Sequence, residues 1–163
     1  KTNPFEESVR VPLIISGCQA TYDGYLQHQD RHLVNHVDMA PTTLGLCGID
    51  APDFMQGHDY SPLRLSWRSP HEYPDSAFLQ LVVPTGHADS TEFAWRGIIS
   101  NDGYKFVSFA HMPWLLFNLN EDPLEQVNLA HNSLYAGKRR ELTARLRRWI
   151  DETGDDFPLM DEG

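Results

Sequence analysis

The chain has 163 residues, of which 40% are hydrophobic, so it can form a folded domain with a substantial core, and extensive disorder is excluded. Its formal net charge is -10, and six of its thirteen Lys and Arg residues lie between Lys138 and Arg148. Nucleic-acid binding is therefore not expected, because phosphate affinity needs clustered cations and the basic stretch has the pattern of one helix face. No run approaches the roughly 18 apolar residues of a membrane span.

The first part of the chain has the pattern of an α/β sheet. Val11–Ile15 is a short apolar run with β-branched residues that ends at Ser16-Gly17, which is typical of a buried inner strand of a mostly parallel sheet. The polar, His-rich stretch from Cys18 to Asn35 predicts a surface loop. It leads to a short strand around residues 35–37.

A helix is predicted after this loop. Asp38 is suited to cap a helix that starts at Met39, and Gly48 is suited to end it. Leu44 and Cys47 are expected to face inward. Prolines then recur between residues 51 and 74, which indicates an irregular connector.

The second part of the chain predicts an antiparallel sheet followed by a helix. Asn101-Asp102-Gly103 is a plausible tight turn between two of the strands. A later helix, with Ser133 as its cap and Gly154 at its carboxyl end, has apolar residues at offsets of four, seven and eight. The four strands are expected at 77–83, 93–100, 104–110 and 115–119, and the helical stripe consists of Leu142, Leu146, Trp149 and Ile150.

Two separated stretches carry a resemblance to a known family. The run from Lys1 to Pro12 fits the pattern Lys-x3-aromatic-Glu-x3-Arg-x-Pro, with Phe5 at the aromatic position, and resembles a segment of the sulfatases of the alkaline phosphatase superfamily. The second stretch fits the same family in the expected order. It comprises Trp95-Arg96-Gly97, Asp102-Gly103-Tyr104-Lys105-Phe106, Leu116-Phe117-Asn118-Leu119, Glu121-Asp122-Pro123 and Val127-Asn128-Leu129.

This resemblance implies a fold class and a division of the chain. The fold is expected to be α/β: the last part of an alkaline-phosphatase-like mixed sheet plus a C-terminal four-stranded antiparallel sheet packed with a helix. Residues 1–75 would be the C-terminal end of the large sulfatase domain, and residues 76–163 a small subdomain. Because the chain begins with Lys1 inside a motif, it is expected to be a fragment of a longer enzyme. The N-terminal part of the same polypeptide would then be its partner.

The resemblance also implies a catalytic residue. In sulfatases the lysine at the position of Lys1 contacts a sulfate oxygen and offsets charge that develops on the leaving group. A compact ammonium with three donors suits that task. The family's nucleophile is a formylglycine made from Cys or Ser in a Cys/Ser-x-Pro/Ala-x-Arg motif, which neither Cys18 nor Cys47 matches. The formylglycine and the calcium ligands are therefore expected upstream, with no metal site in this chain, and the fragment alone is expected to be inactive.

Other charged residues admit two interpretations. Glu6, Glu7 and Arg10 resemble an acid, a base and an anion clamp, but an ion pair that locks the loop is favoured. Trp95 and Arg96 could form a platform and a fork for an anionic substrate, although a core aromatic and a strand-edge arginine are the more ordinary interpretation.

Three histidines raise the question of a metal site. His28, His32 and His36 recur every fourth residue, as zinc ligands on a helix would. The stretch has no helical apolar stripe, so metal binding there is disfavoured. Cys18 and Cys47 match no zinc or redox motif, and whether they pair is left open.

Three functions from different classes follow. The favoured one is a sulfatase that hydrolyses sulfate esters of small molecules or sugars. The second is a phosphodiester or phosphonate monoester hydrolase of the same superfamily, and the third a non-catalytic interaction module. A soluble protein is expected, in the cytoplasm or the periplasm.

Overall fold

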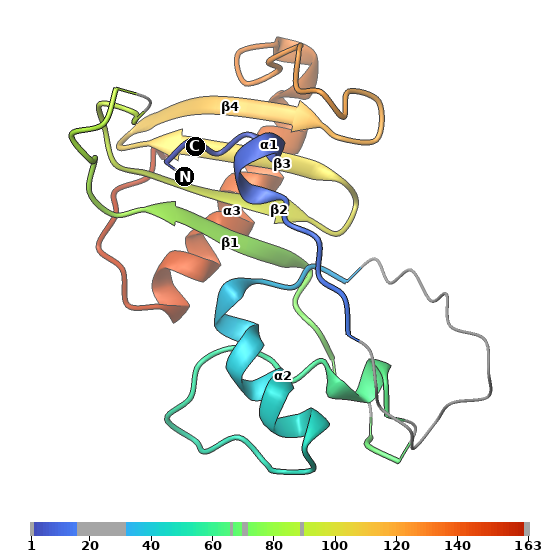
Figure 1. Ribbon diagram of the computed structural model, residues 1–163. Helices are drawn as coiled ribbons and strands as arrows, with labels where there is room; N and C mark the ends of the chain where they lie inside the picture. The colour runs from blue at the N-terminus through green and yellow to red at the C-terminus, as the bar shows by residue number, and fades with distance from the viewer. Residues whose placement is uncertain (1, 16–31, 66, 70–71, 89, 162–163) are drawn as a thin grey trace. The chain divides into compact units, whose positions relative to one another are not determined.

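The computed structural model describes residues 2–15, 32–65, 67–69, 72–88 and 90–161 (Figure 1). Two compact units are present. One consists of Lys1–Pro12 together with Ser76–Gly163, and the other of Leu13–Asp75. Residues 2–12 are thus grouped by their contacts with the C-terminal sheet, and the division expected from the resemblance, at residues 75 and 76, stays a prediction. Within the described part of the chain, no helix combines the length and the apolar character needed to cross a membrane.

The larger unit is built on the predicted four-stranded antiparallel meander. Its strands pair in the order β1-β2-β3-β4. The predicted turn at residues 101–103 is present between β2 and β3, and Gly103 adopts a φ of 86°, which glycine tolerates without strain. The strands are β1 (Ser76–Leu81), β2 (Trp95–Ser100), β3 (Tyr104–Phe109) and β4 (Met112–Asn118).

One face of this sheet packs against α3 (Ala136–Glu152), as Figure 1 shows. The predicted stripe is confirmed, because Leu142, Leu146 and Ile150 are buried in one cluster with residues of β2, β3 and β4. Trp149 stacks on Phe78 of β1 with ring centroids 6.0 Å apart. The residue predicted to cap this helix, Ser133, lies one position after the residue whose side chain makes the capping hydrogen bond.

The helix is preceded by a short 3-10 turn, η4 (Ser133–Tyr135). The side chain of Asn132 accepts a hydrogen bond from the amide of Leu134 at 3.0 Å. Ser133 therefore lies inside the first turn, and Asn132 is the capping residue.

The opposite face of the sheet carries a second apolar cluster of Trp95, Val107, Leu115 and Phe117. We call residues 2–10 the N-terminal segment. It contains the four-residue helix α1 (Glu6–Val9), which lies over this face on the side away from α3 (Figure 1). The sheet thus has a helix on one side and the N-terminal segment on the other.

The smaller unit contains η2 (His36–Asp38), α2 (Met39–Leu46) and η3 (Ser61–Leu63). The strand predicted at residues 35–37 is wrong. The side chain of Asn35 accepts a hydrogen bond from the amide of His36 at 2.7 Å, and Asp38 accepts one from the amide of Asn35 at 2.6 Å. These local side-chain bonds bend the backbone into a 3-10 turn, in competition with an extended strand.

The helix that follows is present where it was predicted, and Gly48 ends it with a φ of 75°. The prediction that Cys47 faces inward is wrong. Cys47 is the C-cap residue and is exposed, because α2 buries Pro41, Thr42 and Gly45, on a different side of the helix.

The inner strand predicted at Val11–Ile15 is not formed among the described residues. The segment is extended but is not part of a sheet, and Ile14 is 85% exposed. A strand needs a neighbour to accept and donate its backbone hydrogen bonds. None of the described residues provides that ladder, so the apolar run stays outside any sheet.

The packing of α3 generates a test of the core. Leu146→Ala should lower the free energy of unfolding by about 3 kcal/mol, because it removes a fully buried side chain and leaves a cavity. Urea denaturation measures this change. The exposed Arg140→Ala on the same helix is the control and should stay within about 0.5 kcal/mol of the wild type. Equal effects of the two substitutions would mean that α3 is not packed as described.

Candidate functional site

Lys1, the predicted catalytic residue, lies outside the described residues, but the backbone that follows it is held on the sheet. The indole Nε1 of Trp95 donates a hydrogen bond to the carbonyl oxygen of Thr2 at 3.1 Å. The ring of Phe5 packs 6.2 Å from that of Phe117, centroid to centroid. Pro4 is fully buried between these contacts. The residues directly after Lys1 are therefore part of the folded unit.

A buried ionic group provides a further attachment. We call Lys105, Glu6 and Glu125 the Lys105 cluster. The ammonium of Lys105 lies 2.7 Å from a carboxylate oxygen of Glu6 and 2.6 Å from one of Glu125. It also donates to the carbonyl oxygen of Pro4 at 2.8 Å. One lysine on β3 thus binds the N-terminal segment through both a side chain and the backbone.

Glu125 completes the cluster with its second oxygen. Its Oε2 accepts a hydrogen bond from the amide of Glu6 at 2.7 Å, while its Oε1 accepts from Lys105. The amide of Glu6 lies in the first turn of α1, where no intrahelical acceptor exists, so Glu125 supplies the missing one. Glu125 adopts a φ of 55°, a left-handed conformation that costs a non-glycine residue about 1–3 kcal/mol.

The burial of these charges determines how much stability is lost when one partner is removed. The Lys105 side chain is 0% exposed, and the Glu125 side chain is 4% exposed. Removing one partner of such a group leaves an uncompensated buried charge, which typically destabilises a protein by about 3–5 kcal/mol. The attachment of the N-terminal segment is therefore stronger than a surface ion pair would make it.

Glu6 forms an ion pair, but its partner is Lys105 and not Arg10. Arg10 and Glu7 are both exposed, whereas Glu6 reaches back to Lys105 of β3. The sequence of β3 already indicates that Lys105 requires an acidic partner. Lys105 alternates with Phe106 and shares a face with Val107 and Phe109, so a charged side chain interrupts an otherwise apolar row. Such a lysine needs an acidic partner.

Arg96, the second predicted substrate-binding residue, is engaged within the fold. It is 5% exposed, and its guanidinium makes a bidentate ion pair with Asp155, in which Nη2 donates to Oδ1 at 3.1 Å. Nη1 donates to the carbonyl oxygen of Leu81 at 3.0 Å. The guanidinium also lies 4.7 Å from the ring centroid of Phe157. These contacts favour a structural role that ties the residues after α3 to the sheet.

Trp95 and Arg96 are not brought together. Successive strand residues point to opposite faces, so Trp95 lies with the N-terminal segment and Arg96 lies with α3 and Asp155. A joint platform and fork for one substrate is therefore not formed by this pair.

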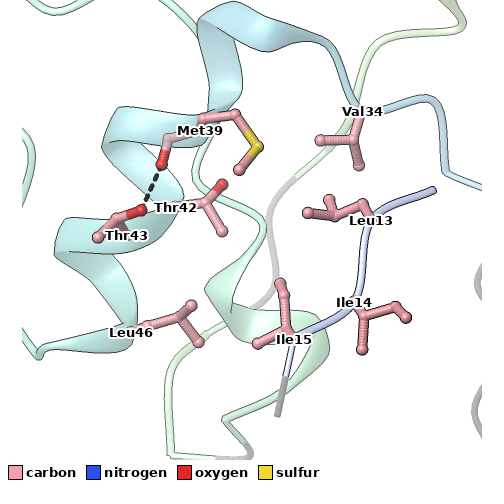
Figure 2. Close-up of a pocket in the computed structure, with 8 residues that line it drawn as sticks. All are labelled: Leu13, Ile14, Ile15, Val34, Met39, Thr42, Thr43 and Leu46. Atoms are coloured by element: carbon pink, nitrogen blue, oxygen red, sulfur yellow. Dashed lines mark hydrogen bonds between the residues drawn. The ribbon is translucent and has the colours of Figure 1, made fainter. Parts of the chain in front are cut away.

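The smaller unit contains a pocket of about 310 Å³ (Figure 2). Figure 2 shows Leu13 and Ile15 pointing toward α2, while Ile14 projects away from it. This alternation is that of an extended strand. The lining is apolar apart from two threonines, so it provides packing surface but no acid, base or nucleophile. It consists of residues 13–15, Val34, Met39, Thr42, Thr43 and Leu46.

The structure describes two of the three histidines at which metal binding was disfavoured, His32 and His36. His28 lies outside the described residues, and the ring of His32 packs edge-on against Tyr73 at 4.7 Å. His36 lies in η2. Among the residues that the structure describes, no group of three or more His, Cys, Asp or Glu side chains is arranged to hold a metal ion.

Comparison with known families gives a match over most of the chain. The family model described as N-sulphoglucosamine sulphohydrolase, C-terminal, matches residues 1–152. An ulvan-active sulfatase of Formosa agariphila is 28% identical over 160 residues, which are 96% of this chain and 30% of the relative. An N-acetylglucosamine-6-O-sulfatase of Bacteroides thetaiotaomicron is 27% identical over 158 residues, 94% of this chain and 27% of the relative. The chain thus spans less than a third of the length of these relatives.

Solved structures give the same fold. One, described as a complex with its substrate D-glucosamine-2-N,6-O-disulfate, matches with a TM-score of 0.61 and 25% identity over 74% of this chain and 24% of that chain. A phosphonate monoester hydrolase of Agrobacterium radiobacter matches with a TM-score of 0.56 and 25% identity, covering 71% and 24%. The predicted fold class, an α/β protein of the alkaline-phosphatase-like type with a four-stranded antiparallel sheet, is confirmed.

The ion pair of Arg96 generates a prediction about pH. Hydrogen bonds from the Arg96 guanidinium hold the pKa of Asp155 below its ordinary value. A lowered folded-state pKa stabilises the fold above the ordinary pKa of Asp, and this stabilisation is lost as the pH falls through the lowered value. Asp155→Asn should therefore lower the free energy of unfolding by about 3 kcal/mol at pH 7.

The difference between wild type and Asp155→Asn should shrink toward zero in strongly acidic solution, where the wild-type carboxyl is protonated as well. Urea denaturation of both proteins at a series of pH values from neutral downward measures it. A difference that does not change with pH would contradict the ion pair.

Proposed function

We propose that this chain, which belongs to the N-sulphoglucosamine sulphohydrolase C-terminal family of the sulfatases, is the carboxyl-terminal part of an enzyme that hydrolyses sulfate esters. The observation that carries the proposal is the family match over residues 1–152, which includes Lys1, Phe5, Glu6 and the other residues of the first motif. The chain spans less than a third of its curated relatives, so the activity belongs to the longer polypeptide.

Lys1 is the catalytic residue that this chain would contribute. Its ammonium would contact a sulfate oxygen of the bound ester and stabilise the negative charge that develops as the ester bond breaks. Such stabilisation is effective only when the charge is held in place before the reaction. The bonds from the sheet to Thr2, Pro4 and Glu6 support this role, because they fix the backbone next to Lys1.

The nucleophile and the metal would come from other parts of the intact enzyme. By resemblance, a formylglycine supplies the nucleophile and calcium binds the sulfate. Cys47 is followed by Gly-Ile-Asp-Ala and does not fit the modification motif. The described residues do not fit a calcium site either, since they contain no group of acidic and other ligands arranged around a metal. The chain alone is therefore proposed to be inactive.

A sulfated sugar is the proposed class of substrate. The description of the matching family names N-sulphoglucosamine, and the description of a similar structure names a disulfated glucosamine as its substrate. A relative acts on N-acetylglucosamine-6-O-sulfate esters according to its name. These descriptions concern the relatives, and they support an amino sugar with a sulfate group as the first substrate to test.

The N-terminal part of the same polypeptide is the proposed partner. Residues 13–15 are extended, alternate in direction and leave Ile14 largely exposed (Figure 2). An apolar extended segment with these features is suited to become an inner strand once neighbouring strands are supplied. We therefore infer that this run completes a larger sheet in the intact enzyme.

A second function is favoured by one specific observation. The phosphonate monoester hydrolase matches this chain at the same 25% identity as the complex with the disulfated glucosamine. Hydrolysis of phosphonate monoesters or phosphodiesters is therefore the alternative. The relative rates with a sulfate ester and a phosphonate monoester of the same leaving group distinguish the two.

The role of Lys1 is tested in the full-length polypeptide. Lys1→Met should lower kcat/KM for a sulfated glucosamine by about 10²–10³-fold, because it removes a preorganised charge at the reacting group. Steady-state kinetics of sulfate release measure the effect. Lys138→Met is the matched control and should change kcat/KM less than twofold, since Lys138 forms partly exposed ion pairs that contribute little.

Two outcomes would count against this function. Wild-type activity in Lys1→Met would remove the proposed catalytic role. Faster turnover of the phosphonate monoester than of the sulfate ester would instead favour the alternative reaction.

A further inference from the structure

Glu125 joins parts of the chain that are far apart in the sequence. It follows β4, and its carboxylate binds the ammonium of Lys105 with one oxygen and the amide of Glu6 with the other. No described acidic side chain other than Glu125 and Glu6 is paired with Lys105. The two oxygens of Glu125 thus hold both the sheet and the first turn of α1.

The backbone of Glu125 is strained, so its contacts with Lys105 and Glu6 form at a conformational cost. Its φ of 55° is unfavourable for residues that carry a side chain, although Asn and Asp tolerate it better than the others. The turn around it is fixed, because the amide of Glu125 donates to the carbonyl oxygen of Asp122 at 3.1 Å. The carboxylate of Asp122 also accepts from the amide of Val127 at 2.8 Å. The turn therefore presents the Glu125 carboxylate in one direction.

Three attachments then follow each other at alternate residues after Lys1. Trp95 holds the carbonyl of Thr2, Lys105 holds the carbonyl of Pro4, and Glu125 holds the amide of Glu6. These bonds hold the backbone at every second residue from Thr2 to Glu6. A displacement of a catalytic group by about 1 Å is enough to lower a rate by about 10²-fold.

We propose that Glu125 is a positioning residue, which acts through Lys105 and Glu6 to fix the place of Lys1; this rests on the catalytic role proposed above for Lys1. Glu125 does not itself touch the substrate. Its effect should therefore depend on the presence of Lys1.

The test uses the full-length polypeptide and four variants. Glu125→Gly removes the carboxylate and relieves the backbone strain, because glycine adopts a φ of 55° without cost. Glu125→Gln keeps an oxygen that can accept from the amide of Glu6. Asp155→Asn is the matched control, since it breaks another buried ion pair of the same unit that does not touch the N-terminal segment. Lys1→Met is combined with Glu125→Gly in a double-mutant cycle.

The expected kinetic result is a decrease of kcat by about tenfold or more in Glu125→Gly, with a smaller change in KM, under conditions where every variant is folded. Glu125→Gln should recover part of the loss, and Asp155→Asn should lie within twofold of the wild type. In the Lys1→Met background, Glu125→Gly should have no further effect. Additive losses, or equal losses in Glu125→Gly and Asp155→Asn, would overturn the positioning role while leaving the function of Lys1 intact.

Limited proteolysis gives a readout that does not depend on activity. A glutamyl endopeptidase can cleave after Glu6 or Glu7 only when α1 leaves the sheet, and the rate reports the population of that open form. Glu125→Gly should increase this cleavage by about tenfold or more relative to the wild type, with the released peptides identified by mass spectrometry. Unchanged cleavage would overturn the inference whatever the activity. Increased cleavage together with a fully active Lys1→Met would show instead that the proposed function of Lys1 is wrong.

Discussion

The ammonium of Lys105 is wholly buried in the sheet, and such a charge is tolerated only when carboxylates and carbonyl groups surround it. One carboxylate comes from Glu6, which precedes the sheet by about 70 residues of sequence, and the other comes from Glu125 in the turn after β4. Burying this lysine therefore requires the N-terminal segment, β3 and the turn after β4 to be in place together. The rest of the larger unit is arranged around that requirement.

The sheet serves two purposes because its faces differ. The face toward α3 supplies an ordinary apolar core of Leu142, Leu146 and Ile150, and this core holds the unit together. The other face carries Trp95, Phe117 and the Lys105 cluster, and it binds the segment that follows Lys1. In the proposed sulfatase, a stable sheet would thus provide a fixed base for a catalytic ammonium contributed by a short segment of chain.

Sequence patterns predicted the parts of the fold that depend on local periodicity. Alternation and turn residues located the four strands, and the stripe ending at Ile150 located α3. Patterns of this kind report burial, not partners. They marked Val11–Ile15 as apolar but did not reveal that no described strand pairs with it. The bonds of Asn35 depend on local geometry, and the contact between Glu6 and Glu125 joins residues 119 apart in sequence. That contact could not be predicted from the motif around Glu6, because Glu125 is not among the residues that carry the family resemblance.

Because the Lys105 cluster joins the N-terminal segment to the sheet, the segment should unfold with the sheet and not as a frayed terminus. Native-state hydrogen exchange of the Glu6 amide, followed by NMR at increasing denaturant concentration, tests this most directly. We expect this amide to exchange with the same free energy as the amide of Phe106 in the centre of β3. Exchange with a free energy near zero, independent of denaturant, would mean that Glu125 does not hold the segment on the sheet.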